Sequence, residues 1–181
     1  GLGFERIETA PQGVQVSLQD GNIITAKYVV AADGMWSPVR KAVGCTPAGY
    51  LGDWHAFRQY LKADGANSRD LWVWFEKDLL PGYAWSFPLA DGRVNLGFGV
   101  PRKSGVNGRQ LAAIWSGLLE RPSVRQVLGK VEPEDPHSAW PIPARLPKAQ
   151  LTKGPVLFVG DAATATDPMT GEGIGQALES G

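Results

Sequence analysis

Two aspartates in this chain each follow a short apolar run and precede small residues. Asp33 follows residues 28–32 ("YVVAA"), and Asp161 follows residues 155–160 ("PVLFVG"). A carboxylate directly after a buried strand lies at the carboxyl end of a sheet, where open α/β folds bind their ligands. A ribose hydroxyl is a natural partner for such a group. The alternative for Asp161 is a structural one, in which its carboxylate caps the following turn.

A glycine-rich segment follows Asp161. Residues 168–174 ("PMTGEGI") place small residues where a backbone must approach a ligand, and they lead into a predicted helix whose first amides favour negative charge. A glycine-rich loop alone is a weak indication of a cofactor site. Its position shortly after Gly160 and Asp161 strengthens the prediction. Glu172, at the start of that helix, is interpreted as a helix cap.

A third segment with chemical potential is aromatic. Residues 83–88 ("YAWSFP") alternate, so that Tyr83, Trp85 and Phe87 point to one face of a strand while the small residues between them point to the other. An aromatic wall of this kind suits a long apolar ligand that is held mainly by buried area. The alternative is that the three rings belong to an ordinary sheet core.

The two aspartate segments require a sheet to position them. Residues 28–32 and 155–160 are typical of strands buried on both faces, and we expect both in one parallel, helix-covered sheet despite their separation in sequence. Ser37 and Pro38 predict a short helix after Asp33, with Gly44 at its end. Residues 14–24 predict a β-hairpin with its turn at 20–22.

The middle of the chain has a different pattern. Residues 53–100 alternate aromatic and polar residues between turn signals, which predicts an antiparallel sheet. Residues 110–120 have helical spacing and predict a helix that covers this sheet, whereas the proline-rich residues 132–147 predict an extended connector. Trp72, Trp74 and Phe75 are interpreted as packing residues.

The order of these elements predicts an α/β protein, α+β overall, with two domains. We expect a discontinuous cofactor-binding domain with a mostly parallel sheet, formed by residues 1–48 and 146–181, interrupted by an antiparallel-sheet substrate domain at 49–145.

Composition limits the partners. Eighteen basic and eighteen acidic residues give no net charge, so nothing draws the chain to nucleic acid. No apolar run reaches the roughly 20 residues of a membrane span, and we expect a cytoplasmic protein. The single cysteine excludes an internal disulfide, and His55 and His137 lack neighbours at metal-ligand spacing, so we expect no metal site.

Two of these segments resemble a known family. Residues 156–181 ("VLFVGDAATATDPMTGEGIGQALESG") resemble the Gly-Asp motif of the aromatic-hydroxylase-like flavoproteins, which bind FAD, and residues 29–40 ("VVAADGMWSPVR") resemble their Asp-Gly motif. The sequence of residues 167–181 ("DPMTGEGIGQALESG"), together with "YAWSFP" at 83–88, resembles the geranylgeranyl reductase branch of that superfamily more closely than the phenol hydroxylases.

The resemblance implies roles for individual residues. Asp161 would bind ribityl or ribose hydroxyls of FAD, and the loop at 168–174 would line its pyrophosphate and ring. The implied cofactor-binding residues are Asp33, Gly34, Arg40, Gly160, Asp161, Pro168, Gly171, Glu172, Gly173 and Ile174. The implied substrate-binding residues are Tyr83, Trp85, Phe87 and Pro88.

The implied activity is FAD-dependent reduction of carbon–carbon double bonds in a polyprenyl lipid, with NADPH or another donor reducing the flavin. The lipid substrate would bring peripheral membrane contact. One alternative is an FAD-dependent monooxygenase or halogenase acting on an aromatic or apolar small molecule, and another is a non-catalytic flavin-binding domain. No strand here is followed by Gly-x-Gly-x-x-Gly, so we expect a fragment without the N-terminal dinucleotide-binding motif. No residue identifies itself as the proton donor, and the catalytic residues stay unassigned.

Overall fold

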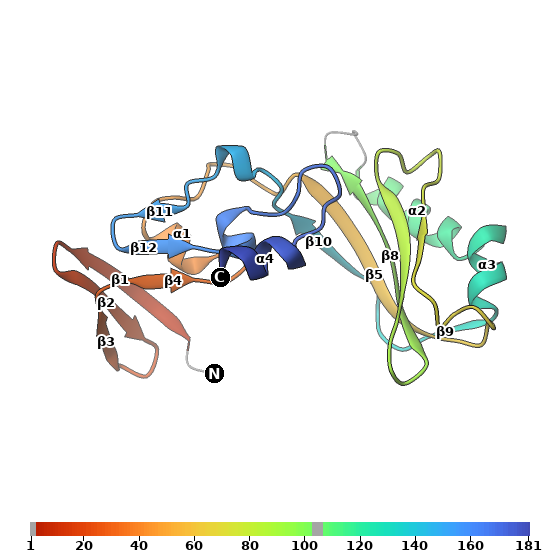
Figure 1. The fold of residues 1–181 in the computed structure, drawn as a ribbon, viewed down its shortest axis with the longest axis horizontal. Helices are drawn as coiled ribbons and strands as arrows, with labels where there is room; N and C mark the ends of the chain where they lie inside the picture. Colours follow the sequence, from red (N-terminus) through yellow and green to blue (C-terminus); the bar gives the residue numbers. More distant parts are fainter. Residues whose placement is uncertain (1–2, 103–106) are drawn as a thin grey trace. The chain divides into compact units, whose positions relative to one another are not determined.

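The structure is a computed structural model that describes residues 3–102 and 107–181, and it divides into two compact units. Unit 1 combines the two ends of the chain, residues 1–52 and 142–181, and unit 2 is the continuous segment 53–141. Figure 1 shows the elements of both units along the chain. Each unit has its own buried core.

Unit 1 contains two small sheets and short helices. The first sheet is antiparallel and consists of β1 (Phe4–Ala10), β2 (Gly13–Leu18) and β3 (Ile23–Ala26). The second has the order β11 (Thr152–Lys153), β12 (Val156–Phe158) and β4 (Val29–Ala31). The helices are α1 (Pro38–Ala42), α4 (Ile174–Ser180) and the 3-10 turns η2 (Leu146–Lys148) and η3 (Gly160–Ala163).

The two strands that precede the aspartates pair directly. Strands β4 and β12 are parallel, with Val29 opposite Val156 and Ala31 opposite Phe158. The prediction that they share a sheet is therefore confirmed. Because both run in the same direction, the segments that follow them, with Asp33 and Asp161, leave the sheet at the same edge.

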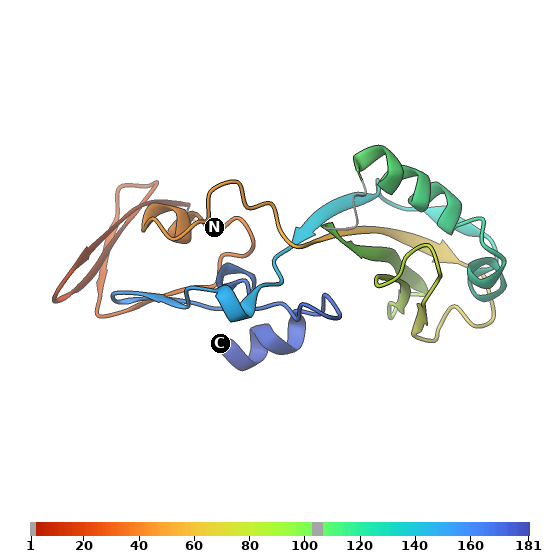
Figure 2. The ribbon, with the colours of Figure 1, turned by 90° about the horizontal axis from the view of Figure 1, so that it is seen from above.

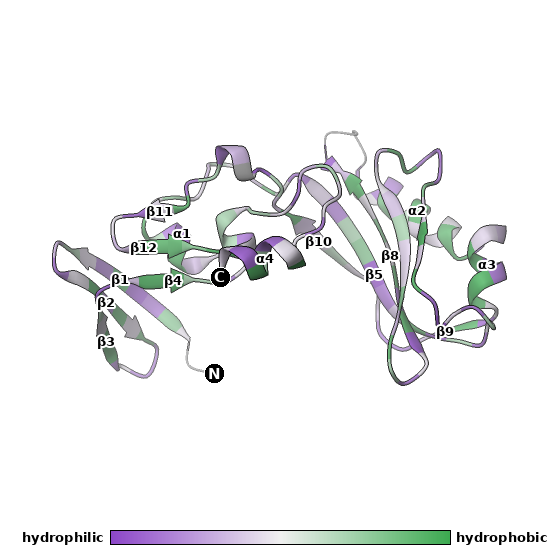
Figure 3. Cartoon of the chain, viewed as in Figure 1, coloured by the Kyte–Doolittle hydropathy of each residue, from purple (hydrophilic) through white to green (hydrophobic). Residues whose placement is uncertain are grey.

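The prediction of a mostly parallel sheet is not confirmed, and the sheet is mixed. A tight turn at Gly154, with φ +54°, joins β11 to β12, so these two strands are antiparallel. The expectation of burial on both faces is also wrong for the described residues. Ala31 and Phe158 are buried against Val39 of α1, whereas Val30 on the opposite face is 57% exposed. Figure 3 colours β4 and β12 as hydrophobic, but some of these apolar residues, such as Val30 and Leu157, are exposed.

Helix α1 begins and ends as its sequence predicts. Pro38 is its first residue, and the Ser37 hydroxyl accepts a hydrogen bond from the Arg40 amide at 2.9 Å. Gly44 follows the helix with φ +72°, a conformation that glycine adopts without strain. The predicted hairpin at 20–22 is also present, between β2 and β3.

Unit 2 is built on a six-stranded antiparallel sheet with the order β10-β5-β8-β7-β6 and β9 beside β5. Its strands are β5 (Trp54–Ala63), β6 (Trp72–Trp74), β7 (Tyr83–Pro88), β8 (Arg93–Pro101), β9 (Val131–Pro133) and β10 (Ser138–Ile142). Two helices follow β8, namely α2 (Gly108–Leu118) and α3 (Pro122–Leu128). The antiparallel sheet predicted from alternation is confirmed.

Helix α2 covers one face of this sheet, as predicted (Figure 2). Its buried residues, including Leu111 and Trp115, pack with Leu96 and Phe98 of β8 in one core. Asn107 and Gln110 start the helix by exchanging hydrogen bonds between side chain and backbone in both directions, a capping box.

Of the three aromatic residues interpreted as packing residues, two fit that interpretation. Trp72 and Trp74 stack with centroids 6.2 Å apart and pack against the helix-covered core. Phe75 is 70% exposed, so the interpretation is wrong for this residue. It follows the last residue of β6, and its ring lies 5.9 Å from that of Tyr83.

The proline-rich residues 132–147 are extended, but they do more than connect. They include most of β9 and all of β10, which pair with β5. Between these strands, Asp135 accepts hydrogen bonds from the Arg58 guanidinium and the Tyr60 amide, both at 2.8 Å. Prolines are tolerated because these strands are short and lie beside a single neighbour.

None of the described helices combines the length and apolar character needed to cross a bilayer.

Candidate functional site

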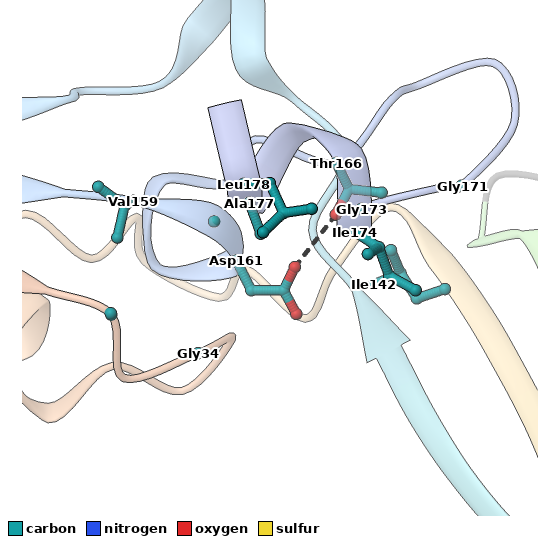
Figure 4. Close-up of a pocket in the computed structure, with 12 residues that line it drawn as sticks. Gly34, Ile142, Val159, Asp161, Thr166, Gly171, Gly173, Ile174, Ala177 and Leu178 are labelled. Atoms are coloured by element: carbon teal, nitrogen blue, oxygen red, sulfur yellow. Dashed lines mark hydrogen bonds between the residues drawn. The ribbon is translucent and has the colours of Figure 1, made fainter. Parts of the chain in front are cut away.

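A cleft of about 600 Å³ lies in unit 1 at the edge where β4 and β12 end. It is lined by Ala32, Gly34, Ile142, Val159, Gly160, Asp161, Thr166, Gly171, Gly173, Ile174, Ala177 and Leu178. Figure 4 shows these residues. The cleft thus brings together six of the residues to which the sequence assigned cofactor binding, and Asp161 is its one ionisable lining group.

Asp161 projects from η3, directly after β12 (Figure 4). Gly160 precedes it with φ +54°, which lets the chain turn sharply out of the strand. One carboxylate oxygen, Oδ1, accepts a hydrogen bond from the Thr166 hydroxyl at 3.1 Å. Burial raises the pKa of Asp161, and the hydrogen bond from Thr166 works in the opposite direction.

The glycine-rich loop after η3 is organised by two acidic side chains. Asp167 accepts hydrogen bonds from the Met169 amide at 2.9 Å and from the Thr170 hydroxyl at 2.8 Å, and these bonds lower its pKa. Glu172 accepts from the amides of Ile174 at 2.6 Å and Gly175 at 3.0 Å. Glu172 therefore caps α4, as predicted, and its carboxylate already occupies two of the first amides of this helix.

Arg40 is not among the residues that line the cleft. Its side chain is 5% exposed and donates from Nη1 to the Ala162 carbonyl at 2.9 Å and from Nε to the Cys45 carbonyl at 3.2 Å. The guanidinium also lies 6.0 Å from the centre of the Phe158 ring. Burial lowers the pKa of Arg40 from its ordinary value. Arg40 thus fixes the η3 turn that carries Asp161.

The structure separates the other predicted cofactor residues. Asp33 accepts a hydrogen bond from the Val39 amide at 3.1 Å and so supports the start of α1, while its neighbour Gly34 lines the cleft. Pro168 lies on the loop outside the lining residues, as Glu172 does. Pro168 and Glu172 therefore belong to the loop that borders the cleft, whereas Gly171 and Gly173 of the same loop line it.

The lining fits a flavin because it offers backbone surface and one acceptor for hydroxyls. Gly34 has φ +78°, and a Cβ built there meets no atom within 4 Å, so the backbone itself faces open space. At Gly173 a Cβ would lie 2.9 Å from the Thr166 hydroxyl oxygen, so this position also requires glycine in the observed arrangement. Asp161 supplies the acceptor that a ribityl hydroxyl needs.

Sequence analysis missed several residues of the cleft. Ile142, Ala177 and Leu178 reach it from β10 and α4, and Thr166 reaches it from the loop. Each is an ordinary small or apolar residue with no local signal. The helical register of α4 relative to Gly173 is the signal that could have found Ala177, one turn further along the same face.

In unit 2, the predicted aromatic wall lies on the face of the sheet that α2 does not cover. Ala84 belongs to the core on the helix-covered side, so the alternating residues Tyr83, Trp85 and Phe87 point the other way. Neighbouring rings in this row are 5.9 Å apart, and Trp54 lies 6.5 Å from Tyr83. Pro88, the last residue of β7, is also exposed, but by the alternation of the strand it points to the other face from Phe87. The alternative that these rings form the unit's core is therefore wrong.

Gly97 of β8 makes room for the central ring, and Gly99 lies beside it. Gly97 lies opposite Trp85 in the register, and a Cβ there would lie 2.4 Å from Cζ2 of that indole. Gly99 lies opposite Tyr83, where a Cβ would lie 3.6 Å from the rings of Trp54 and Trp85. Trp85 can therefore lie across β8. Glycines at two alternate positions in a strand are the signal that sequence analysis passed over.

A polar cluster borders the same face. The ring of Tyr60 lies 4.5 Å from the Arg58 guanidinium and 6.0 Å from that of Arg93. Arg58 pairs with Asp135 at 2.8 Å, and Arg93 pairs with Asp91 and Glu134. Each of these cations already has a carboxylate partner, so the face presents rings and neutralised charges.

Neither His55 nor His137 belongs to a metal-binding group among the residues that the structure describes. His137 stacks on Phe57 with centroids 5.6 Å apart, and burial lowers the pKa of His55. Within residues 3–102 and 107–181, His, Cys, Asp and Glu form no group of three or more that could hold a metal ion.

Comparison with known proteins identifies the family of this chain. The family described as FAD binding domain matches residues 2–179. Since the match includes nearly every residue, the chain belongs to the FAD binding domain family.

Curated relatives agree with this assignment. A menaquinone reductase of Mycolicibacterium smegmatis is 30% identical over 92% of this chain and 42% of the relative. A digeranylgeranylglycerophospholipid reductase of Methanocella arvoryzae is 33% identical over 86% of this chain and 38% of the relative. The chain thus spans about two fifths of the length of these relatives. The resemblance to the geranylgeranyl reductase family is confirmed.

Solved structures show the same fold. A geranylgeranyl bacteriochlorophyll reductase-like protein from Thermoplasma acidophilum matches with a TM-score of 0.73 and 23% identity, over 97% of this chain and 45% of that one. A variant of the halogenase PltM in complex with FAD matches with a TM-score of 0.72 and 14% identity, over 98% of this chain and 40% of that one. The predicted mixed α/β fold is confirmed.

Proposed function

We propose that the full-length protein containing this chain reduces carbon–carbon double bonds of a polyprenyl lipid and uses FAD as its redox cofactor. The observation that carries the proposal is the row of Tyr83, Trp85 and Phe87, which lies on the sheet face that α2 leaves uncovered. Relatives named as menaquinone and digeranylgeranylglycerophospholipid reductases support it.

Unit 1 would serve as the FAD-binding part. Asp161 would accept hydrogen bonds from ribityl or ribose hydroxyls, Gly34 and Gly173 would let the backbone approach the cofactor, and Arg40 holds the η3 turn in place. In its reduced form, bound FAD would supply the two electrons for alkene reduction, and NADPH or another donor would reduce it again. The protein's own contribution is the position and burial of these groups.

Unit 2 would serve as the substrate-binding part. A prenyl chain offers little to hydrogen-bond, so its affinity comes from apolar area removed from water, at about 25 cal/mol per Å². Tyr83, Trp85 and Phe87 provide an apolar row for this purpose, and Pro88 ends the strand that carries it. Because lipids with long prenyl chains reside in bilayers, we propose that the protein contacts the membrane peripherally and is otherwise cytoplasmic.

A flavin-dependent halogenase or monooxygenase is the second candidate, because the PltM halogenase shares this fold. Fold alone does not determine the reaction. A small aromatic substrate needs a concave pocket that encloses it, whereas the aromatic row here lies on a sheet face that α2 leaves uncovered. The reductase is therefore favoured.

Anaerobic turnover distinguishes the two classes. The full-length protein, FAD, a chemical reductant and a prenyl lipid would be incubated without oxygen, and the lipid analysed by mass spectrometry. The reductase adds pairs of hydrogen atoms to the lipid. A product that requires air and gains an oxygen atom or a halogen would refute the proposal.

A further inference from the structure

Thr166 is a buried residue whose hydroxyl donates a hydrogen bond to Asp161. The residue is 1% exposed, and its Oγ1 donates to Oδ1 of Asp161 at 3.1 Å. The two residues lie five positions apart, on opposite sides of the turn at Thr164. Figure 4 shows the bond inside the cleft.

This bond leaves the second carboxylate oxygen of Asp161 available. In the part of the chain that the structure describes, the hydrogen bonds of Asp161 include no donor to Oδ2. A carboxylate has two oxygens with about four lone-pair sites, so one oxygen can be held while the other binds a ligand. The Thr166 bond therefore selects which oxygen of Asp161 is presented to the cleft and restricts rotation of the group.

Gly173 provides the space for this arrangement. A Cβ at that position would lie 2.9 Å from Oγ1 of Thr166 and 3.6 Å from Oδ1 of Asp161. Gly173 has φ −130°, a value that any residue adopts, so the requirement for glycine here is one of space and not of backbone conformation. The start of α4, the loop and η3 thus meet at the Thr166–Asp161 bond.

We infer that Thr166 is a positioning residue for the flavin site, which holds Asp161 in the orientation that accepts a cofactor hydroxyl, and that Gly173 is glycine to admit this bond. The inference rests on the proposed role of Asp161 in holding FAD. Thr166 acts through Asp161, because its own hydroxyl is buried and already donated. A fixed acceptor binds more tightly than a mobile one, since less side-chain freedom is lost on binding.

The direct test is the affinity of the full-length apo-protein for FAD, measured from the quenching of flavin fluorescence. Thr166→Val keeps the shape and removes the donor, and we expect FAD binding to weaken by about tenfold. Thr166→Ser keeps the hydroxyl, and we expect it to bind FAD within about twofold of the parent protein. Equal weakening in both variants would overturn the inference, because a packing role does not depend on the hydroxyl.

Two glycine variants give an independent test that does not alter Thr166. Gly173→Ala should weaken FAD binding to a similar extent as Thr166→Val, because its new Cβ displaces the Thr166 hydroxyl. Gly175→Ala is the matched control, since a Cβ there approaches a neighbouring atom, Oε2 of Glu172, only to 3.4 Å. An unchanged FAD affinity in a folded Gly173→Ala protein would contradict the inference.

A double-mutant cycle separates this inference from the proposed function. With Asp161→Ala as the background, Thr166→Val should cause little further loss, because the two residues act as one unit. If Asp161→Ala weakens FAD binding and Thr166→Val does not, the positioning role is wrong and the cofactor role stands. If Asp161→Ala leaves the affinity unchanged, the cofactor role of Asp161 is wrong, and the positioning role falls with it.

Discussion

The guanidinium of Arg40 donates a hydrogen bond to the carbonyl of Ala162 at 2.9 Å, although 122 residues separate them in the sequence. This bond joins helix α1, which follows β4, to the η3 turn after β12. The parallel pairing of β4 with β12 brings both segments to one edge of the sheet, and Arg40 then fixes the distance between them. The geometry at Asp161 therefore depends on a side chain outside the cleft.

Replacing Arg40 should affect both stability and cofactor binding. Arg40→Met leaves the Ala162 and Cys45 carbonyls without their donor, and we expect the free energy of unfolding to fall by about 2 kcal/mol, with weaker FAD binding. Urea unfolding of the full-length protein measures the first effect. Lys41→Met, an exposed neighbour, should change it by less than about 0.5 kcal/mol. Equal effects of both substitutions would contradict this role of Arg40.

Gly97 should tolerate substitution much less well than Gly99. An alanine at Gly97 places its Cβ 2.4 Å from Cζ2 of Trp85 and 2.4 Å from the Phe57 carbonyl oxygen, so both must move. We expect Gly97→Ala to cost about 1–3 kcal/mol and to alter tryptophan fluorescence. Gly99→Ala meets its nearest atoms at 3.6 Å and should leave both quantities nearly unchanged. Indistinguishable variants would mean that Trp85 does not lie across Gly97.

Substitutions at Trp85 and Trp72 should distinguish a residue that binds substrate from one that packs in the core. Trp85→Ala shortens the aromatic row, so we expect prenyl-lipid turnover to fall while FAD content is retained. Trp72 packs against the helix-covered core, so Trp72→Ala should lower stability without a selective loss of turnover per folded molecule. Loss of flavin from the Trp85 variant would show that this residue is structural.

Asp161 and Asp167 should titrate on opposite sides of the ordinary aspartate value of about 3.9. Burial raises the pKa of Asp161, so its contribution favours the folded state below the unfolded pKa and is lost as pH rises through the folded pKa. The Met169 amide and the Thr170 hydroxyl lower the pKa of Asp167, so its contribution is present above the unfolded pKa and is lost as pH falls through the folded pKa. Carboxyl NMR titration measures both pKa values. A lower pKa for Asp161 than for Asp167 would contradict the burial of Asp161 and the hydrogen bonds to Asp167.

The sequence predicted those parts of the molecule that depend on local pattern. Alternation and turn residues predicted the sheet of unit 2 and the common face of Tyr83, Trp85 and Phe87, and the two apolar runs predicted that β4 and β12 share a sheet. The motif residues Gly34 and Asp161 both line the cleft. These features follow from side-chain periodicity and from the position of a residue relative to the end of a strand.

The remaining features depend on the course of the folded chain, which a local sequence pattern does not show. Nothing near Thr166 indicates that its hydroxyl meets Asp161, because the bond exists only after the turn at Thr164 folds the chain back. Arg40 belongs to a recognised motif, yet one of its two carbonyl partners, Ala162, lies 122 positions further along the chain. The exposed face at Val30 escaped prediction because an apolar run does not show which of its faces is covered.

The central claim is that the cleft around Asp161 holds FAD, and the FAD content of the purified full-length protein tests it most directly. After extensive dialysis, the parent protein and an Asp20→Ala control in the exposed turn between β2 and β3 should keep their flavin, measured by its absorbance against protein concentration. Asp161→Ala should lose most of it while its circular dichroism stays unchanged, because a single hydrogen-bond acceptor worth about 1–3 kcal/mol has been removed. An Asp161→Ala protein that keeps the same FAD content as the parent would contradict the account.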